Sequence, residues 1–415
     1  MIYDCIIVGA GASGLFAGAR FDTAAGGRPA GLILEKTGRA GTKLLMSGGG
    51  RCNITHAGSI KDFIDRYGKK GGRIRSCLYK HNNLELIGFL EENGISTVTQ
   101  EEDGRVFPAS GKAQDIRDFL VRKSRENGFE IAYNQEVTGI RRIPAEEAGV
   151  SQSHSSHSAP ACWELTANKT TFRAKTIILA SGGCSYPATG SDGQLFSVLQ
   201  RDLDLKVTTL RPALTSIRVQ SYPYTELTGI AFADCRITLL REHKKIAEEN
   251  GGLLFTHRDF SGPAILNISN YAQPGDTLVI DYLKIPQDAA ASKLQKSVEK
   301  SSGELPAVLA KTFELPKKFS RLLAAHIGSS TKSLAAALTG DKFQITSLSG
   351  FEKAMTTAGG IDLMQIDLKT MELKEHSGIF VCGEMIDIDG STGGYNLQFA
   401  YSSGCTAAES AIKLL

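Results

Sequence analysis

Two sets of residues near the start of the chain have the types and spacing to hold a dinucleotide. Gly9, Gly11 and Gly14 form a Gly-x-Gly-x-x-Gly turn directly after the apolar residues 5–8, and Glu35 follows a second apolar run. Backbone N–H groups at a helix start bind phosphate, and an acid about 20 residues further on accepts hydrogen bonds from a ribose. The pattern predicts an adenine dinucleotide site. An acid at position 35 argues against a 2′-phosphate on its ribose.

A glycine-rich loop follows this acid directly. Residues 38–56 read G-R-A-G-T-K-L-L-M-S-G-G-G-R-C-N-I-T-H. Three consecutive glycines rule out a regular helix or strand, and a loop of this composition commonly follows a ligand surface closely. We therefore expect Lys43 and Arg51 to face a pyrophosphate and Asn53 to offer its amide to the ring of the cofactor. A surface loop with solvated charges is the alternative.

Two later strands end in residues that fit the same ligand. The apolar residues 176–179 lead into the small residues 180–183, and a strand near the C-terminus ends in Gly383-Glu384. In two-part flavin-binding folds the first of these turns returns to the glycine loop, and the acid binds the ribityl hydroxyls. We expect a last helix to begin near residues 393–397. Its positive end would then stabilise negative charge on a reduced flavin ring.

Side chains able to move protons are few. His257 lies in the segment L-F-T-H-R-D-F, and Tyr395 lies at the start of the expected last helix. Both are weak candidates for acid–base catalysis, and a purely structural histidine is the more frequent case. The eight cysteines show no C-x-x-C spacing, which indicates neither a dithiol centre nor a zinc site. His154 and His157 have no third ligand nearby in sequence, so we predict no metal site.

The elements that position these residues alternate between strands and helices at both ends of the chain. This order is typical of an α/β fold of the Rossmann type. Between the ends lie β-branched runs that indicate an antiparallel sheet or small barrel, followed by helical spacing broken at glycines and prolines. We predict an FAD-binding domain from residues 1–190 and 345–415, an inserted β domain at 191–284 and a helical subdomain at 285–344.

Composition places the chain among globular proteins. It has 415 residues, of which 41% are hydrophobic, and a net charge of +3, enough for a large core and two or three domains. We see neither a leader nor an apolar run long enough to cross a membrane, and therefore expect a cytoplasmic protein with reduced thiols. Residues 61–80 carry many lysines and arginines and few acids. We expect residues 59–94 to be helical, and a solvated helical face explains these charges better than a patch for an anionic substrate.

Five segments together resemble the BaiN/YhiN-like flavoproteins, a group that includes aminoacetone oxidases. The segments span residues 42–53, 104–110, 254–266, 357–361 and 383–404. The resemblance covers nearly the whole chain in order. It implies an FAD-binding two-dinucleotide-domain fold with a β-barrel-like insert and a helical subdomain, acting as an oxidoreductase.

This chain also departs from the family's pattern. Gly252 and Asp259 stand where relatives often have an acid and a glycine, and Cys405 stands where a bulkier residue is common. Substrate assignments made for relatives should therefore not be transferred.

The patterns and the resemblance together predict which residues contact FAD, with Val137 expected to hold the adenine through its backbone. The predicted contacts are Gly9, Gly11, Ala12, Ser13, Gly14, Glu35, Lys36, Lys43, Arg51, Cys52, Asn53, Val137, Ala180, Gly182, Gly383, Glu384, Gly394, Tyr395, Asn396 and Leu397.

These features predict an FAD-dependent oxidoreductase that transfers hydride through flavin N5. Our first choice is reduction of an activated C=C bond in a small organic substrate, with NADH or NADPH as a transient donor. An amine oxidase that produces hydrogen peroxide is the alternative, and an RNA-modifying or RNA-binding flavoprotein is a further one. We expect a small-molecule substrate, no membrane contact and no nucleic acid. The sequence leaves the oligomeric state, the donor and the acceptor open.

Overall fold

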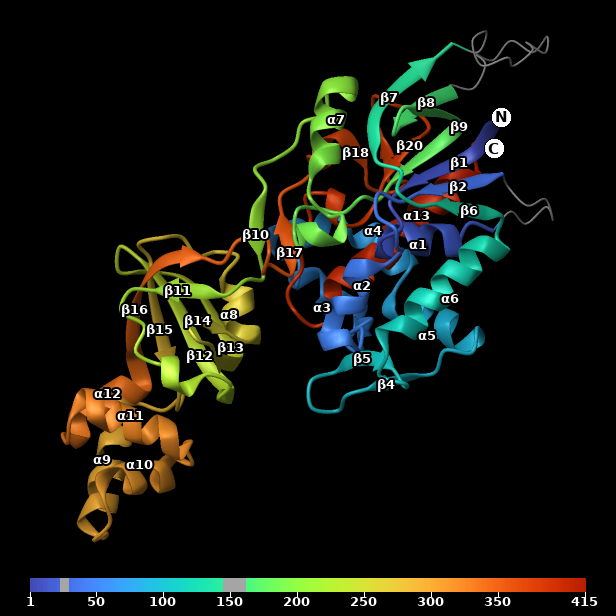
Figure 1. The fold of residues 1–415 in the computed structure, drawn as a ribbon. Helices are drawn as coiled ribbons and strands as arrows, with labels where there is room; N and C mark the ends of the chain where they lie inside the picture. Colours follow the sequence, from blue (N-terminus) through green and yellow to red (C-terminus); the bar gives the residue numbers. More distant parts are fainter. Residues whose placement is uncertain (23–29, 145–161) are drawn as a thin grey trace. The chain divides into compact units, whose positions relative to one another are not determined.

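A computed structural model describes residues 1–22, 30–144 and 162–415 (Figure 1). The chain forms two compact units. Unit 1 comprises Met1–Arg211 and Thr356–Leu415, and unit 2 comprises Pro212–Met355. The serine-rich stretch with His154 and His157 lies outside the described residues.

Unit 1 is built on a sheet whose central part consists of five parallel strands. Their spatial order is β20 (Ile379–Val381), β9 (Thr170–Leu179), β1 (Ile2–Val8), β2 (Gly31–Leu34) and β6 (Phe129–Ala132). Each is an apolar run because helices cover such a sheet on its faces. The fold confirms the predicted Rossmann-type α/β class.

Short antiparallel strands extend this sheet. β18 (Ile366–Asp367) and β19 (Glu372–Leu373) continue it beyond β20, while β8 (Cys162–Ala167) pairs with both β7 (Val137–Ile143) and β9.

The strand order reverses at β1, which pairs with β2 on one side and with β9 on the other. All five parallel strands end at one edge of the sheet. Ligands of open α/β sheets bind outside this carboxyl edge, at the point where the order reverses. A ligand is therefore expected at the turns after β1, β2, β9 and β20.

Helices α1 (Ala12–Ala19) and α13 (Tyr395–Ile412) pack closely against each other in unit 1. A Cβ on Gly404 of α13 would lie 2.6 Å from the carbonyl oxygen of Ser13. Only glycine allows this approach without displacing backbone. The two ends of the chain are thus joined at the carboxyl edge, as we predicted.

The remaining elements of unit 1 surround this core. The predicted helical stretch 59–94 is confirmed as α3 (Ile60–Asp65), η2 (Gly68–Arg73), α4 (Arg75–Lys80) and α5 (Asn83–Glu92). β4 (Thr97–Thr99) and β5 (Arg105–Pro108) form a hairpin, to which β3 (Thr55–His56) adds. The others are α2 (Thr42–Met46), η1 (Ser47–Gly50), α6 (Ala113–Glu126), η3 (Pro187–Thr189), α7 (Gln194–Leu203), β17 (Thr356–Ala358), η5 (Leu363–Gln365) and η6 (Gly383–Met385).

Unit 2 contains a closed six-stranded barrel, in the order β11-β14-β13-β12-β15-β16. The strands are β11 (Ile217–Val219), β12 (Ala231–Arg241), β13 (Lys244–Phe255), β14 (Asp259–Ser261), β15 (Thr277–Asp281) and β16 (Asp341–Leu348). We did not predict β16. Its sequence signal is only a short alternation, and pairing with the distant β11 and β15 creates the strand.

Helices complete unit 2. They are α8 (Pro263–Ile268), α9 (Gln287–Glu299), α10 (Leu305–Phe313), α11 (Lys317–Ile327) and α12 (Thr331–Gly340), with the short η4 (Thr225–Leu227). α9 to α12 are separated where glycines and prolines predicted breaks. β10 (Arg211–Ala213) lies where the chain passes from unit 1 into unit 2.

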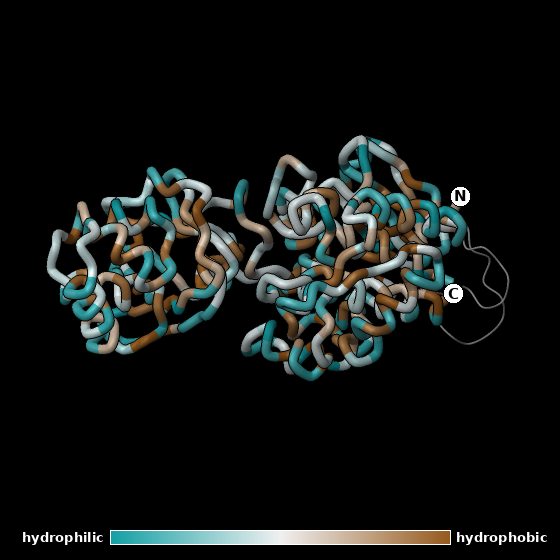
Figure 2. Tube along the Cα trace, turned by 90° about the horizontal axis from the view of Figure 1, so that it is seen from below, coloured by the Kyte–Doolittle hydropathy of each residue, from teal (hydrophilic) through white to brown (hydrophobic). Residues whose placement is uncertain are grey.

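Hydrophobic segments run through the interior of unit 1, and hydrophilic segments are frequent at its periphery (Figure 2). The residues of β1 from Cys5 to Val8 are at most 5% exposed. Among the described residues, we find no helix with the length and apolar character needed to cross a membrane.

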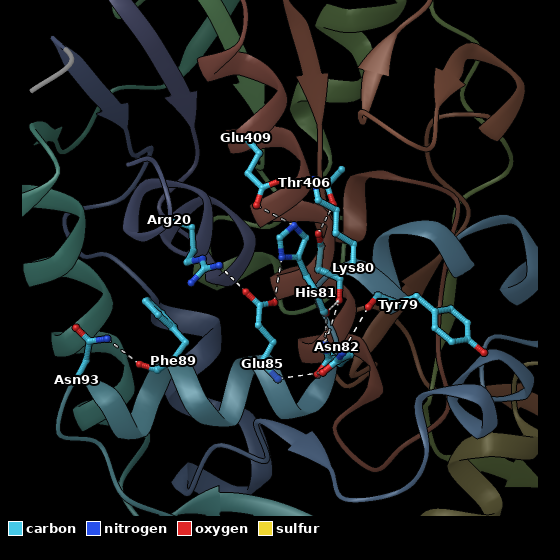
Figure 3. A network of polar contacts seen from close by, with 12 residues as sticks. Arg20, Tyr79, Lys80, His81, Asn82, Glu85, Phe89, Asn93, Thr406 and Glu409 are labelled. Atoms are coloured by element: carbon cyan, nitrogen blue, oxygen red, sulfur yellow. Dashed lines mark hydrogen bonds and ion pairs between the residues drawn. The ribbon is translucent and has the colours of Figure 1, made fainter. Parts of the chain in front are cut away.

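A polar network in unit 1 holds α13 against α4 and α5 (Figure 3). The buried His81 contacts Glu85 through Nδ1 at 3.0 Å and Glu409 of α13 through Nε2 at 3.3 Å. Its carbonyl oxygen also accepts hydrogen bonds from Gln398 Nε2 at 2.9 Å and Ser402 Oγ at 2.6 Å. The network thus fixes the helix that begins at the predicted flavin site.

This network predicts a pH-dependent contribution to stability. Burial by itself would lower the pKa of His81, but Glu409 and Glu85 outweigh it and raise that pKa above its ordinary value. Protonated His81 therefore stabilises the folded state fully below pH ~6.5, and the effect is lost as pH rises through the raised pKa. We expect His81→Asn to lower the free energy of unfolding more at pH ~5.5 than at pH ~9.

Fluorescence of Trp163 measures this difference during urea unfolding. It is the single tryptophan of the chain and is buried in β8 of unit 1. Glu409→Gln removes one partner of His81, so it too should lower the free energy of unfolding more at pH ~5.5 than at pH ~9. An equal loss of stability at both pH values in His81→Asn would contradict the assigned role.

Candidate cofactor site

The glycine turn after β1 leaves space that larger residues would fill. A Cβ on Gly9, whose φ is +104°, would lie 2.6 Å from the oxygen of Ala180, and one on Gly14 would lie 2.0 Å from the oxygen of Gly9. Gly11 meets only the Ala180 oxygen, at 3.9 Å, so its outer side is open. It is the N-cap of α1 and provides no side-chain cap. The N–H groups that follow, those of Ala12 and Ser13, can therefore bind an anion.

Glu35 lies at the end of β2 and is 8% exposed. Its Oε2 accepts a hydrogen bond from the N–H of Ala10 at 2.8 Å, and its Oε1 accepts from the N–H of Thr37 at 2.8 Å and the Thr37 hydroxyl at 2.7 Å. These bonds fix the carboxylate beside the glycine turn. Oε2, which has a single partner, keeps acceptor capacity for a ribose hydroxyl.

Lys36 faces carboxylates of its own chain. Its Nζ lies 2.8 Å from Glu136 and 2.5 Å from Asp192, and it also donates to Gln194 at 3.0 Å. Partial burial opposes the charge, but Asp192 and Glu136 outweigh it and raise the pKa of Lys36. Its cation is therefore neutralised locally, and contact with FAD stays a prediction for this residue.

Lys43 of α2 reaches Glu384, which follows β20. The Nζ–Oε2 distance is 2.6 Å, and Lys43 also donates to the hydroxyl of Ser185. Glu384 Oε1 accepts from Ser185 Oγ and from the N–H of Thr357, both at 2.8 Å. Burial by itself would raise the pKa of Glu384, but Lys43 and these hydrogen bonds outweigh it and lower that pKa. Glu384 is thus a fixed anion at the carboxyl edge.

The glycine-rich loop ends against the start of α13. Once its amide is oriented to satisfy its neighbours, Asn53 accepts from the N–H of Gly394 at 3.0 Å and donates to the carbonyl of Thr55 at 3.0 Å. Cys52 is fully buried, and burial raises the pKa of its thiol to about 12. Arg51 is exposed and lies over the ring of Phe107, 4.5 Å from its centroid.

The residues at the start of α13 take different roles. The buried Tyr395 ring packs among His56, Phe63 and Tyr67, and Tyr67 Oη donates to the Tyr395 carbonyl at 2.8 Å. Asn396 clasps the Gly390 backbone, accepting from its N–H and donating to its oxygen, each at 2.8 Å. Leu397 is partly buried.

The N-cap of α13 is Gly394, which carries no side-chain cap, so the positive end of the helix faces the end of the glycine-rich loop.

The turn after β9 holds two further predicted contacts. Ala180 is buried against Gly9, and Gly182, with φ +82°, would place a Cβ 2.8 Å from Ser191 Oγ. That hydroxyl is buried and has no hydrogen-bond partner among the described residues. The same holds for Oε1 of Gln135. The Gln135 N–H donates to the carbonyl of Glu35. Buried polar groups are normally paired, so both atoms fit a site completed by a polar ligand.

The remaining predictions concern Val137, Gly383 and His257. Val137 is buried at the start of β7. A Cβ on Gly383 would lie 2.5 Å from Ser13 Oγ, so the turn after β20 touches the start of α1. His257 lies in unit 2, exposed between β13 and β14, with Nδ1 3.3 Å from the Thr228 hydroxyl. A proton-transfer role for His257 or Tyr395 stays a prediction.

Four residues of this region were not predicted as site residues. Ser185 and Thr357 hold Glu384, Ser191 carries the unpaired hydroxyl, and His56 stacks on Tyr395. Thr357 and His56 lie within glycine-rich motifs noted in the sequence. Their place in those motifs could have identified them as site residues. No sequence signal marked Ser185 or Ser191 as site residues, because serines are common in the loops that follow strands.

The fold and the turns at its carboxyl edge define a dinucleotide-binding protein of the two-part flavin type. The chain matches, over residues 3–410, the family described as HI0933-like protein Rossmann domain, and it belongs to that family. The family membership confirms the resemblance we stated and implies FAD as the cofactor.

Relatives and a solved structure agree with this assignment. The chain is 30% identical over 418 residues to the ribosomal RNA dihydrouridine synthase of Haemophilus influenzae, covering 97% of each. It is 27% identical to the 3-dehydro-bile acid delta(4,6)-reductase of Clostridium scindens, covering 98% of each. Its fold resembles that of a 3-ketosteroid-delta4-(5alpha)-dehydrogenase from Rhodococcus jostii RHA1, with TM-score 0.51, 14% identity and coverage of 98% and 97%.

The protein is therefore an FAD-dependent oxidoreductase of the HI0933-like family. The predicted enzyme class is confirmed.

Proposed function

We propose that this protein reduces a C=C bond conjugated to a carbonyl group, and that the bond belongs to a uridine of ribosomal RNA. Two relatives support the reaction type. The name dihydrouridine synthase describes saturation of the uracil C5=C6 bond, and the name delta(4,6)-reductase describes saturation of C=C bonds in a bile acid. Both acceptors are alkenes that a carbonyl group activates towards hydride.

The choice of RNA rests on one observation, the position of the basic segment 61–80. All of its lysines and arginines except Lys70 are exposed: Lys61, Arg66, Lys69, Arg73, Arg75 and Lys80. Lys80 is paired with Glu409. Phosphate groups of a nucleic acid bind such side chains, with release of counterions.

This segment is fastened to the loop that precedes α13. The Arg66 carbonyl accepts from the N–H of Ser391 at 2.9 Å, and Lys70 lies 2.5 Å from Asp387. Tyr67 adds its bond to Tyr395. The exposed cations are therefore anchored beside the helix start where we place the flavin ring. This weighs against our first expectation that nucleic acid is not a partner.

Within unit 1, the residues at the carboxyl edge would bind and orient FAD. The α1 amides would hold the pyrophosphate, Glu35 the adenosine ribose, and Glu384 the ribityl chain. The α13 N-terminus would favour negative charge on the ring. Bound FAD supplies the hydride for this reduction from N5, and NADH or NADPH is the proposed donor that reduces it.

The test uses the purified holoprotein with NADH or NADPH and unmodified ribosomal RNA. We expect one uridine to gain two hydrogen atoms, detected by mass spectrometry of nuclease digests. Reduction of cyclohexenone with no reduction of any uridine would replace RNA by a small enone, as the bile acid reductase suggests. Peroxide released from a small amine in air, without reduction of either alkene, would instead support the amine-oxidase alternative.

Charge reversal tests the RNA surface separately. The double variant Lys69→Glu, Arg73→Glu should weaken RNA binding and reduce the salt dependence, by roughly 0.7–0.9 in the slope of log K against log salt for each phosphate that the variant no longer neutralises. Filter binding at several salt concentrations measures both. Arg122→Glu with Arg125→Glu, on exposed positions of α6, is the matched control. Equal effects of the two variants would remove the assignment of segment 61–80.

A further inference from the structure

His56 occupies a defined position at the ring end of the site. It ends β3, directly after the glycine-rich loop, and its imidazole lies nearly parallel to the Tyr395 ring, at 5.4 Å between centroids and 19° between planes. The Phe63 ring meets it edge-on at 6.2 Å. His56 is therefore held by two aromatic rings beside the start of α13.

The hydrogen bonds of His56 determine its tautomer. Nδ1 accepts from the N–H of Gly58 at 3.0 Å, so the proton of a neutral imidazole is on Nε2. The ring is only partly buried, and within the described part of the chain Nε2 has no hydrogen-bond partner. Nε2–H is thus a fixed donor available to a ligand.

Charged side chains lie around His56. The acid near it, Asp103, is bound by Arg105, with Nε 2.6 Å from Oδ2. Arg105 is also the residue opposite His56 in the β3–β5 pair, and Arg66 lies over the Tyr395 ring. The nearby carboxylate is therefore already engaged by a guanidinium.

Gly104 provides the space that the imidazole occupies. Its φ is +71°, and a Cβ there would lie 2.6 Å from His56 Cε1 and 3.0 Å from Nε2. Any larger residue at position 104 would displace the ring from this position.

We propose that His56 is a catalytic residue whose Nε2–H donates a hydrogen bond to the carbonyl oxygen of the reducible substrate. This inference rests on the proposed function. Reduced FAD, with NADH or NADPH as its proposed reductant, would supply a hydride from N5 to the substrate β-carbon. The C=C electron pair would then move to form an enolate, and the α-carbon would take a proton from solvent. His56 keeps its proton throughout and stabilises the negative oxygen, as preorganised donors do.

The experiment separates the two half-reactions. The holoprotein is reduced anaerobically and then mixed with cyclohexenone, with RNA or with oxygen. We expect His56→Phe, which keeps an aromatic ring, to slow oxidation by cyclohexenone and RNA about 10²-fold and to leave oxidation by oxygen unchanged. His56→Gln, which retains an N–H donor, should recover part of the rate. His326→Gln, on the exposed face of α11 in unit 2, is the matched control.

A second readout needs no turnover. Nitrogen NMR of the imidazole should show the proton on Nε2 and an unprotonated Nδ1. A proton on Nδ1, or equal enone rates in His56→Phe and wild type, would overturn the role of His56 while leaving the proposed function intact. Failure of the wild-type protein to reduce either alkene would overturn the proposed function and this inference with it.

Discussion

Gly14→Ala should yield a protein that purifies without its yellow cofactor. The added methyl group would lie 2.0 Å from the Gly9 oxygen and 3.2 Å from Ala180 Cβ. The turn cannot move aside, because α1 is held against α13 at Gly404. Overpacking of this kind costs about 1–3 kcal/mol, which corresponds to a loss of about 5- to 150-fold in affinity for FAD if the whole cost falls on binding. Flavin absorbance per polypeptide, with chromatography of the released cofactor, measures the loss.

Gly88→Ala is the matched control for this substitution. Gly88 lies within α5, where a Cβ meets no atom within 4 Å. Alanine is the better helix former by about 1 kcal/mol, so this variant should keep FAD and gain slightly in stability. Full FAD content in Gly14→Ala would show that the turn after β1 is not the binding site.

Lys43→Met should destabilise unit 1 substantially, even though it removes no apolar contact. Glu384 would remain as an anion without its cation, at a position where both side chains are at most 26% exposed. Removing one partner of a buried pair costs about 3–5 kcal/mol. Because both side chains keep some exposure, we expect a loss of stability at the lower end of this range. Urea unfolding followed by Trp163 fluorescence measures the loss within unit 1.

A double-mutant cycle identifies the source of that loss. Adding Glu384→Gln to Lys43→Met removes the unpaired charge and should restore part of the stability. Because the pKa of Glu384 is lowered in the folded protein, its contribution is present above pH ~4.3 and is lost as pH falls through the folded value. The effect of Lys43→Met should therefore shrink in acid. Simple additivity of the two substitutions would contradict a direct interaction.

The sequence revealed the site best where the chemistry is local. The turn from Gly9 to Gly14, the strand before it and the acid at Glu35 lie within a single strand–helix–strand unit. Their roles follow from a backbone conformation that only nearby residues control. For the same reason the helix breaks in unit 2 were predicted correctly, since glycine and proline act on their own φ and ψ angles.

Contacts between distant parts of the chain were not predictable in this way. The ion pairs of Lys36 with Asp192 and Glu136 are one example. The bonds of the Asn396 side chain to the Gly390 backbone are another. These partners are brought near only by the folded chain, while the expected FAD contacts of both residues stay predictions.

The sequence by itself determined the Rossmann-type fold, the glycine turn and the acid that follows β2, because hydrophobic period, glycine and spacing are local properties. The tertiary structure alone decided that Lys43 meets Glu384, that His56 stacks on Tyr395, and that the basic segment is anchored beside α13. These pairings join residues more than 300 positions apart. Packing of the parallel sheet and of α1 on α13 sets them, and no short stretch of sequence encodes that geometry.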